Sequence, residues 1–461
     1  MNSFHPQQIS FNDPAGFIFE RQGIFYRQVG SDYATHYDFL MSSGLYGMLV
    51  DKNLLLPHEE IKENFGGSGN WYKILLPRQI KFVSYPYEWC FDQLKDAALT
   101  TLQILKLSVS TGLILKDASP FNIQFLAGRP ISIDTLSFEK YDSTKPWVAY
   151  RQFCQTFLYP LLLGHYLGVD AQKWLLVYPN GITSKMTSNL LPAKSRFSLN
   201  ALLHVFLHNG IGRHPTGQQE RKISFSRTKM DRLIDHLEAA ISRLSYRQKS
   251  PSIWQDYYEQ YPPTGMYLSD KLQVFSQFIC DIKGSLVLDL GCNLGYFSRI
   301  LAAENNLVIA ADTDSPCINA LYLSLKKEKN SNIIPCCIDL SNPSPAGGVE
   351  SIQRQSFGER AKADLVCALA LVHHIVLGAN IPMYNFARLL ADLSKDHLIV
   401  EFVGIEDEKA ALLISRKSTY HQPYTADFFE NQFLQFFDII RKQTVLGTVR
   451  IMYKMKKKQQ A

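Results

Sequence analysis

The stretch SLVLDLGCNLGYFS, from Ser285 to Ser298, decides how the C-terminal half of this chain folds. An apolar run leads to Asp289, a turn containing Gly291 and Gly295 follows, and apolar residues then recur at helical spacing. This is the pattern of a buried strand, a tight turn and a helix. Glycines let the backbone approach a ligand closely, and the first N–H groups of the helix face the same space. The stretch therefore predicts a ligand-binding strand–turn–helix unit.

Further strands and helices alternate after this unit. The predicted strands span residues 307–311, 333–338, 363–370 and 397–403, and the predicted helices span residues 270–282, 316–326 and 386–393. This alternation predicts an α/β fold, a Rossmann-like doubly wound domain with a parallel sheet. Such sheets bind ligands at the carboxyl ends of their strands. The residues predicted at these ends are Asp289, Asp312, Asp339, His373, His374 and Glu401.

The turn itself indicates which ligand binds. A dinucleotide-binding turn reads G-x-G-x-x-G, whereas this one reads DLGCNLG, with Asn293 where a middle glycine would stand. A carboxylate at Asp289 would repel a pyrophosphate but can help to hold a cationic amino-acid group. Asp312 stands where an acidic side chain binds ribose hydroxyls, and Asp339 suits an adenine amine. S-adenosylmethionine combines these groups and is the predicted cofactor.

Two segments carry a family resemblance. LDLGCNLGYFS and DLVCALALVHHI resemble the first and fourth motifs of class I S-adenosylmethionine-dependent methyltransferases, and the resemblance covers residues 265–405. It implies a set of cofactor-binding residues, namely Asp289, Gly291, Asn293, Gly295, Phe297, Asp312 and Asp339. A narrower resemblance is to the NoeA-like, nodulation-associated methyltransferases. SGLYGMLVDKNLLLPHEE, SYPYEWCFDQLKDAAL, LKDASPFNIQF, PWVAYRQFC and HHIVLGANIP carry it over nearly the whole chain.

Catalysis by such an enzyme rests mainly on positioning. Methyl transfer from a sulfonium is an in-line displacement, in which the protein binds, orients and excludes water. A hydroxyl or amine acceptor can also need a base with a pKa near neutrality. His374, then His373, and Glu401 are the candidate catalytic residues. Each also has a structural interpretation, as a histidine pair shaping a turn or as a carboxylate ordering the sheet edge.

The N-terminal half, residues 1–250, is predicted to be a separate α+β domain. A hairpin is expected over residues 17–29 and a long helix over residues 92–110. Helices are also expected over residues 32–50, 147–167 and 227–244, strands over residues 71–76 and 80–85, and a loop over residues 181–196.

Residues 113–139 resemble the catalytic segment of protein kinases and aminoglycoside kinases. Asp117 and Asn122 match the D-x-x-x-x-N spacing, and Asp134 stands where a metal-binding aspartate would follow a hairpin. The segment lacks the His-Arg and Phe-Gly of that pattern, and neither Arg27 nor Lys73 is convincing as a catalytic lysine. These residues are predicted to be either turn residues of a degenerate kinase-like scaffold or a nucleotide and metal remnant.

Composition limits the remaining possibilities. A net charge of +6 is small for 461 residues, so nucleic acid is not indicated, and the basic run at residues 454–458 is predicted to be a solvated tail. Eight cysteines without a C-x-x-C pair predict reduced thiols, no metal site and a cytoplasmic location. No secretory signal or membrane span is expected. His204 and His208 are interpreted as ordinary helix residues.

The predicted organisation is an N-terminal domain at residues 1–250, a linker or flap at 251–264 and a methyltransferase domain at 265–461. The large first domain predicts a bulky methyl acceptor, such as a glycan, a lipid-linked saccharide or a protein, or else a partner-binding module. The alternative function is a nucleotide-binding, kinase-like regulatory or scaffold protein whose second domain senses S-adenosylmethionine. The acceptor and the oligomeric state stay open.

Overall fold

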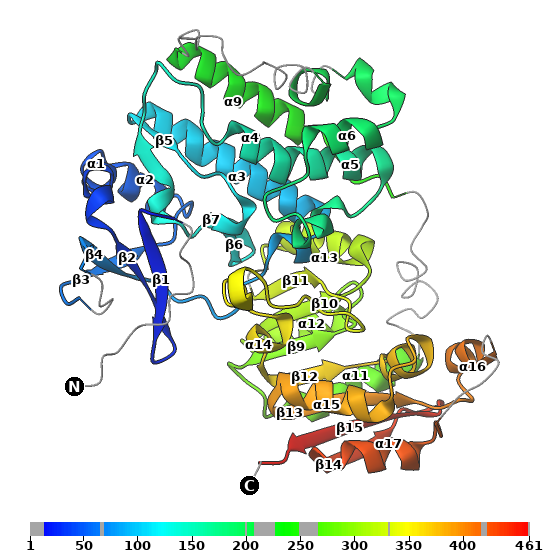
Figure 1. Ribbon diagram of the computed structural model, residues 1–461. Helices are drawn as coiled ribbons and strands as arrows, with labels where there is room; N and C mark the ends of the chain where they lie inside the picture. Colours follow the sequence, from blue (N-terminus) through cyan, green and yellow to red (C-terminus); the bar gives the residue numbers. More distant parts are fainter. Residues whose placement is uncertain are drawn as a thin grey trace. The chain divides into compact units, whose positions relative to one another are not determined.

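The computed structural model describes residues 13–64, 69–198, 201–206, 226–248, 266–330, 332–415 and 422–459 (Figure 1). It divides into two compact units. Unit 1 comprises Met1–Lys249 and Gly347–Arg354, and unit 2 comprises Ser250–Ala346 and Gln355–Ala461. The predicted linker at residues 251–264, with its cluster of aromatic residues, lies outside the described residues, so the domain boundaries stay a prediction.

Among the described residues, unit 2 builds a seven-stranded sheet in the order β11-β10-β9-β12-β13-β15-β14. Its strands are β9 (Leu286–Leu290), β10 (Leu307–Asp312), β11 (Ile333–Cys337), β12 (Ala363–Ala368), β13 (Ser394–Val403), β14 (Phe437–Thr444) and β15 (Arg450–Lys457). The first five in this order are parallel, whereas β15 runs antiparallel to both of its neighbours. The predicted Rossmann-like fold is confirmed, with an antiparallel edge that the sequence interpretation did not include.

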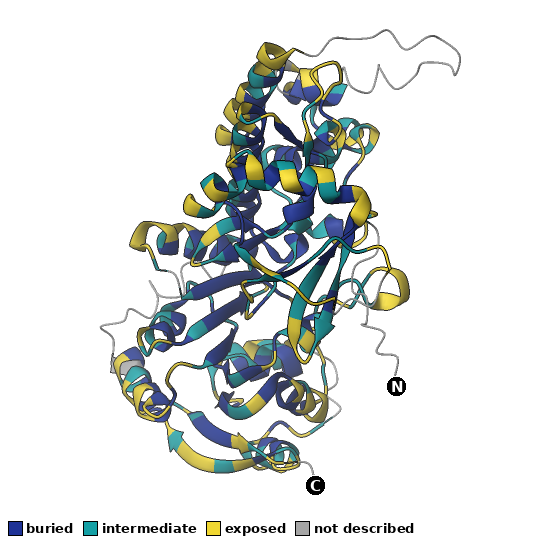
Figure 2. Ribbon diagram, turned by 90° about the vertical axis from the view of Figure 1, so that its left-hand side faces the viewer, coloured by how far each residue is buried: buried dark blue, intermediate teal, exposed yellow. Residues whose placement is uncertain are grey.

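Helices cover the sheet of unit 2. They are α11 (Met266–Ile279), α12 (Tyr296–Ala303), α13 (Ser315–Glu328), α14 (Phe357–Arg360), α15 (Met383–Leu393), α16 (Glu408–Ser415) and α17 (Ala426–Phe433). Strands β9 and β11 are buried at every position, which explains their continuous apolar sequences. The central strands are correspondingly dark in Figure 2. Polar residues at the strand ends therefore stand out against an apolar background.

The basic run near the C-terminus corrects the sequence interpretation. Residues 454–457 are not a solvated tail but lie within β15, which is paired on both sides. Met452, Tyr453 and Met455 are buried, and the Nζ of buried Lys454 lies 2.5 Å from the carboxylate of Asp281. The prediction considered the charge of this run and not the alternation of side chains along a strand. It therefore missed the buried residues that lie between the lysines.

Unit 1 has an antiparallel sheet in the order β1-β2-β4-β3, two short two-stranded pairings and a group of helices. The strands are β1 (Gly16–Arg21), β2 (Ile24–Val29), β3 (His58–Ile61), β4 (Lys73–Pro77), β5 (Leu113–Leu115), β6 (Ile123–Leu126), β7 (Arg129–Ser132) and β8 (Phe138–Lys140). The helices are α1 (Ala34–Ser42), α2 (Leu45–Asp51), α3 (Phe91–Ser110), α4 (Tyr150–Phe153), α5 (Tyr159–Leu167), α6 (Ser184–Leu190) and α9 (Arg227–Ser242). The predicted hairpin and long helix are confirmed.

Two local predictions for unit 1 were wrong. Residues 80–85 are not a strand, and the predicted loop at residues 181–196 contains α6. The N-cap residue of this helix is Thr183, whose hydroxyl accepts a hydrogen bond from the Met186 N–H at 3.2 Å. Its polar sequence lacks the apolar periodicity on which the prediction relied.

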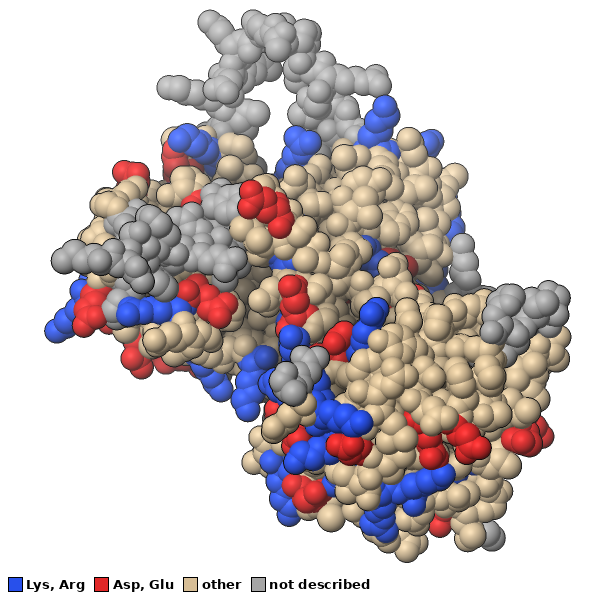
Figure 3. Space-filling model, turned by 60° about the horizontal axis from the view of Figure 1, so that its bottom comes forward, with Lys and Arg blue, Asp and Glu red and all other residues tan. Residues whose placement is uncertain are grey.

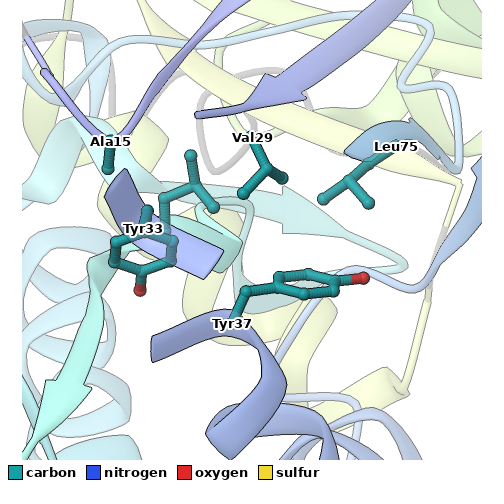
Figure 4. Packing of buried hydrophobic residues seen from close by; sticks show 6 residues of the cluster. Ala15, Val29, Tyr33, Tyr37 and Leu75 are labelled. Atoms are coloured by element: carbon teal, nitrogen blue, oxygen red, sulfur yellow. The ribbon is translucent and has the colours of Figure 1, made fainter. Parts of the chain in front are cut away.

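A buried cluster fixes the first helix of unit 1 to its sheet. Figure 4 shows Tyr33 and Tyr37 packed near Val29 of β2 and Leu75 of β4, and Ala15 completes the labelled set. The hydroxyl of Tyr37 also donates a 2.9 Å hydrogen bond to Glu60. Leu136 belongs to the same cluster, so β2 is held beside the segment that carries Asp134.

Basic and acidic side chains are interspersed on the face seen in Figure 3, in keeping with the small net charge of +6. Within the part of the chain that the structure describes, no helix has the length and apolarity needed to cross a bilayer.

Candidate functional site

A cavity of about 350 Å³ opens in unit 2 at the carboxyl ends of the central strands. It is lined by most of the predicted site residues, namely Asp289, Gly291, Asn293, Phe297, Asp312, Asp339, His373 and His374. The turn and strand-end positions were chosen from sequence alone, and the fold brings them around one space. Gly295 and Glu401 are not among the residues that line it.

The glycine turn shapes one wall of the cavity. Gly291 has a φ of +73°, and a Cβ there would lie 3.3 Å from the side chain of Leu371, which lines the cavity. The N–H of Asn293 donates a 2.8 Å hydrogen bond to Asp312, so the turn is tied to the end of β10. Gly295 instead precedes α12, where a Cβ would approach the Leu321 side chain to 2.6 Å. Its role is helix packing.

Three carboxylates follow the strand order β9, β10, β11. Asp289 is buried and accepts a 2.5 Å hydrogen bond from the Ser298 hydroxyl, and burial raises the pKa of its carboxyl to about 6. Burial also raises the pKa of Asp312. Asp339 is exposed and accepts hydrogen bonds from the N–H and hydroxyl of Ser341, at 2.8 and 2.6 Å. The cavity therefore has an acidic half.

The histidine pair lies after β12, at the π-helical turn η10 (His374–Gly378). His373 is fully buried, and neither ring nitrogen has a hydrogen-bond partner among the described residues. Burial lowers the pKa of His373 well below its ordinary value and the pKa of His374 to about 4. Both rings are therefore neutral at pH 7. The surroundings of these histidines therefore do not produce the expected base with a pKa near neutrality.

The sequence interpretation missed three basic residues of the cavity. Lys271 comes from α11, Lys409 from α16 and Arg450 from the first position of β15. Lys271 could have been found, because it shares a face of α11 with the buried Leu268 and Phe275 at helical spacing. A lysine on an apolar helix face needs a partner. Arg450 could not have been found from the sequence, because its place in the cavity depends on how β15 pairs within the sheet.

Glu401 serves as that partner. The Nζ of Lys271 lies 2.6 Å from its Oε2, and the Arg450 guanidinium lies 4.0 Å from its Oε1. Arg450 also forms a 2.8 Å ion pair with Asp407. Glu401 is fully buried, so its carboxylate acts as a counter-ion for the basic residues and does not face the cavity as a base.

Unit 1 brings its three predicted residues together in a different way. The carboxylate of Asp134 forms a 2.7 Å ion pair with Arg27 and accepts the Leu136 N–H at 3.1 Å. Asn122 donates to the Ser137 hydroxyl at 3.3 Å, and that hydroxyl donates to Asp134. Arg27 thus takes the place that a metal would need, which favours the scaffold interpretation.

Asp117 lies in the same network. Its carboxylate accepts the Ser119 N–H at 2.9 Å, and burial raises its pKa, with a smaller contribution from Asp134. Lys73 pairs with Glu60 at 2.6 Å instead of with Asp134.

No group of three or more histidine, cysteine or acidic side chains suitable for a metal occurs in the described ranges. His204 forms hydrogen bonds with Tyr150 at 2.6 Å and with His236 at 2.9 Å, as an ordinary buried histidine would. His208 lies outside the described residues. None of the eight cysteines forms a disulfide.

Comparison with known proteins adds a relative of similar length. No family model matches the chain. The chain is 29% identical over 454 residues to the nodulation protein NoeA of Rhizobium meliloti (strain 1021), covering 96% of this chain and 94% of the relative. The predicted resemblance to NoeA-like proteins is therefore confirmed along nearly the whole chain.

Solved structures of methyltransferases match part of the chain at low identity. N-methyltransferase NodS from Bradyrhizobium japonicum WM9, in complex with S-adenosyl-l-homocysteine, matches 45% of this chain and 100% of its own at 12% identity and a TM-score of 0.34. The bifunctional kinase-methyltransferase WbdD matches 45% of this chain and 44% of its own at 18% identity and a TM-score of 0.29. At such TM-scores neither likeness carries an argument, so the fold rests on the strand order described above.

Proposed function

We propose that this chain is an S-adenosylmethionine-dependent methyltransferase that acts on a bulky acceptor, such as a glycan, a lipid-linked saccharide or a protein. One observation carries the proposal. A glycine turn and three aspartates at the ends of adjacent strands surround a single cavity in a Rossmann-like sheet. A cofactor with a cationic amino-acid end, a ribose and an adenine matches that sequence of groups.

The residues present fit this cofactor. The buried carboxylate of Asp289 suits the ammonium, directly or through water, because a cation stabilises its charged form. Asp312, fixed by the turn, suits the ribose hydroxyls, and the exposed Asp339 suits the adenine amine. Gly291 leaves room for close approach of the backbone. When bound, S-adenosylmethionine supplies an electrophilic methyl group.

The chain's own residues then orient the acceptor and exclude water. Leu369, Leu371 and Ile375 provide an apolar wall, which keeps water from the reacting atoms. His373 presents two unsatisfied ring nitrogens in neutral form, and His374 lies with its ring centroid 4.0 Å away. We assign this pair to hydrogen bonding the acceptor's nucleophile in neutral form. Glu401 keeps Lys271 in place.

We also place the protein in the cytoplasm, because none of its eight cysteines forms a disulfide and seven of them are buried. The bulky acceptor is suggested by the size of unit 1, which has its own core and sheet. A screen that follows methyl label from the cofactor into cell extract would identify the acceptor class.

Calorimetry on the full chain tests the cofactor. S-adenosylhomocysteine should bind with micromolar affinity, and Asp312→Ala should weaken it about 100-fold, since charged hydrogen bonds to the ribose are lost. Asp438→Ala, at an exposed carboxylate of β14, is the matched control and should bind normally. Binding of Mg-ATP alone, abolished by Asp134→Ala, would overturn the proposal in favour of the kinase-like alternative.

A further inference from the structure

One surface of unit 1 combines exposed apolar side chains with basic ones. It is formed by the 3₁₀ helix η6 (Ala171–Leu176), the turn that follows it and helix α6, and we call it the η6–α6 surface. Both elements pack against α5, and α5 and α6 lie side by side in Figure 1. We propose that this surface binds a membrane rich in anionic lipids. Such binding does not depend on the methyltransferase activity proposed for unit 2.

Three consecutive large apolar side chains project from the end of η6. Leu176, Val177 and Tyr178 are 37%, 71% and 46% exposed. Exposed apolar residues on a folded protein normally occur singly, and a run of three at its surface generally has a function. Because removing apolar side chains from water is favourable, this run gains from contact with an apolar partner.

The turn that carries this run is fixed by the fold. The N–H groups of Val177 and Tyr178 donate hydrogen bonds to the Trp174 carbonyl oxygen at 3.0 and 2.8 Å. After the turn, the N–H of the buried Ile182 donates to the carbonyl oxygen of Gln155 at 2.9 Å. A turn tied at both ends presents its side chains to a partner without losing backbone freedom on binding.

The charges that accompany this run are basic. From Ala171 to Gln219 the chain has no acidic residue, although aspartate and glutamate make up 42 of its 461 residues. Lys173 forms a 3.2 Å ion pair with Asp170 and adds no net charge. The other basic residues of this stretch that the structure describes, none of them paired with a described acidic residue, are Lys185, Lys194 and Arg196. The η6–α6 surface therefore carries a positive charge.

Basic residues from other segments lie near this surface. Burial lowers the pKa of His165 on α5, and the positive charges of Arg247, Lys194 and Lys95 lower it further. Lys194 follows α6, whereas Lys95 belongs to α3 and Arg247 follows α9. Three segments that are far apart in the sequence thus bring cations to one end of α5, which extends the positive potential beyond the stretch after Asp170.

This combination favours a lipid surface over other partners. Basic residues attract anionic headgroups, and the apolar side chains of the turn enter the boundary between headgroups and acyl chains. Tyr178 and the half-buried Trp174 are of the amphipathic type that is enriched at membrane–water interfaces. A nucleic acid would use the basic residues but would leave Leu176 and Val177 in water.

Vesicle flotation of the full chain tests the apolar part of the surface. The probes are vesicles of phosphatidylcholine alone and vesicles of phosphatidylcholine and phosphatidylglycerol in equal parts. The chain should float with the mixed vesicles, and Leu176→Ser combined with Val177→Ser should weaken this binding about tenfold or more. The matched control is Ile440→Ser combined with Leu446→Ser, because these residues of unit 2 are 52% and 65% exposed and should not contribute.

A second pair of variants tests the charge. Lys194→Gln should weaken binding to the mixed vesicles about fivefold, and Lys194→Arg should bind as the unmodified chain does. Lys283→Gln, at a lysine of unit 2 that is 68% exposed, is the matched control and should have no effect. Added salt should weaken the binding of the unmodified chain, because it screens the attraction to the headgroups.

Three outcomes would overturn the proposal. The first is that the unmodified chain floats with neither kind of vesicle, and the second is that it floats equally well with both. The third is that the serine variants of the turn and of unit 2 lose binding equally. Circular dichroism establishes that each variant is folded, and since all the substituted side chains are exposed, the thermal unfolding midpoint should not change. If the turn variant alters the oligomeric state of a chain that does not float, the surface instead contacts protein.

Discussion

Two acidic clusters in this chain look alike in sequence and differ in what balances their charge. In unit 1, the buried Asp134 is neutralised by Arg27 at 2.7 Å and tied to its own turn. In unit 2, Asp289 and Asp312 face a cavity, and burial raises the pKa of both carboxyls. One cluster has an internal cation, and the other lies where a ligand can supply one.

The contrast separates stability from function. A carboxylate with an internal partner contributes to the folded state, and removing the partner leaves a buried charge. A carboxylate whose charged form is disfavoured by burial is instead a candidate for ligand binding. Mutations in the unit 1 cluster should therefore lower stability, whereas mutations in the unit 2 cluster should weaken ligand binding.

The largest effect is expected in unit 1. Arg27→Met should lower the free energy of unfolding by about 3–5 kcal/mol, because it leaves the Asp134 carboxylate buried without a cation. Urea unfolding followed by circular dichroism measures this. The matched control is Lys73→Met, which breaks a half-exposed 2.6 Å pair with Glu60 and should change stability by less than about 1 kcal/mol. Equal losses in the two variants would remove the distinction between the clusters.

A smaller effect, on binding and not on folding, is expected in unit 2. Asp289→Asn should weaken S-adenosylhomocysteine by roughly 2–3 kcal/mol, about 30- to 150-fold, because a charged partner for the ammonium is lost. The unfolding free energy above pH 7 should stay the same or rise, since burial raises the pKa of Asp289 to about 6 and disfavours its charge. Calorimetry and urea unfolding on the same preparation measure both. A destabilised variant with normal affinity would show that Asp289 is structural.

The smallest effect is a pH dependence. Protonation of Asp289 removes its attraction for a cation, so S-adenosylhomocysteine affinity should fall by up to about tenfold per pH unit below pH 6. The raised pKa of Asp289 makes stability depend on pH in the opposite direction to binding. Between about pH 4 and pH 6 the folded chain binds more protons at this site than the unfolded chain, so its contribution to stability decreases as pH rises.

Titrations with S-adenosylhomocysteine at pH 5, 6, 7 and 8 measure the binding part of this prediction. Asp289→Asn is the matched variant and should flatten the profile. A profile that stays steep in the variant would assign the titration to another group.

The site residues that could be predicted from the sequence are those whose positions depend on interactions between residues close together in the chain. The glycine turn, Asp312 and Asp339 were found because each lies at a strand end that its own apolar run defines. Gly295 belongs to the glycine turn and Glu401 to the predicted fifth strand, but the structure gives them packing and charge balance as roles. Local pattern identifies the edge of the sheet, whereas the orientation of each side chain there depends on its neighbours.

What the sequence could not reveal came from pairings between distant segments. Arg27 and Asp134 are far apart in the chain, and their ion pair depends on how β2 packs beside the β7 turn. The basic wall of the cavity likewise needs α11, α16 and β15 to converge. Because β15 contains a run of lysines, charge alone could not identify it as a strand.

The antiparallel strand β15, which is the last strand of its sheet in the chain, has a consequence for synthesis on the ribosome. Because β15 follows every other strand of its sheet in the chain, a nascent chain that ends before residue 450 has all three aspartates but not Arg450. Such a chain would leave the long edge of β13 without its partner, and an open edge of this kind invites pairing with other molecules. Translation stops before the final strand should therefore yield aggregation-prone protein, in which the site is half assembled and its acidic side comes first.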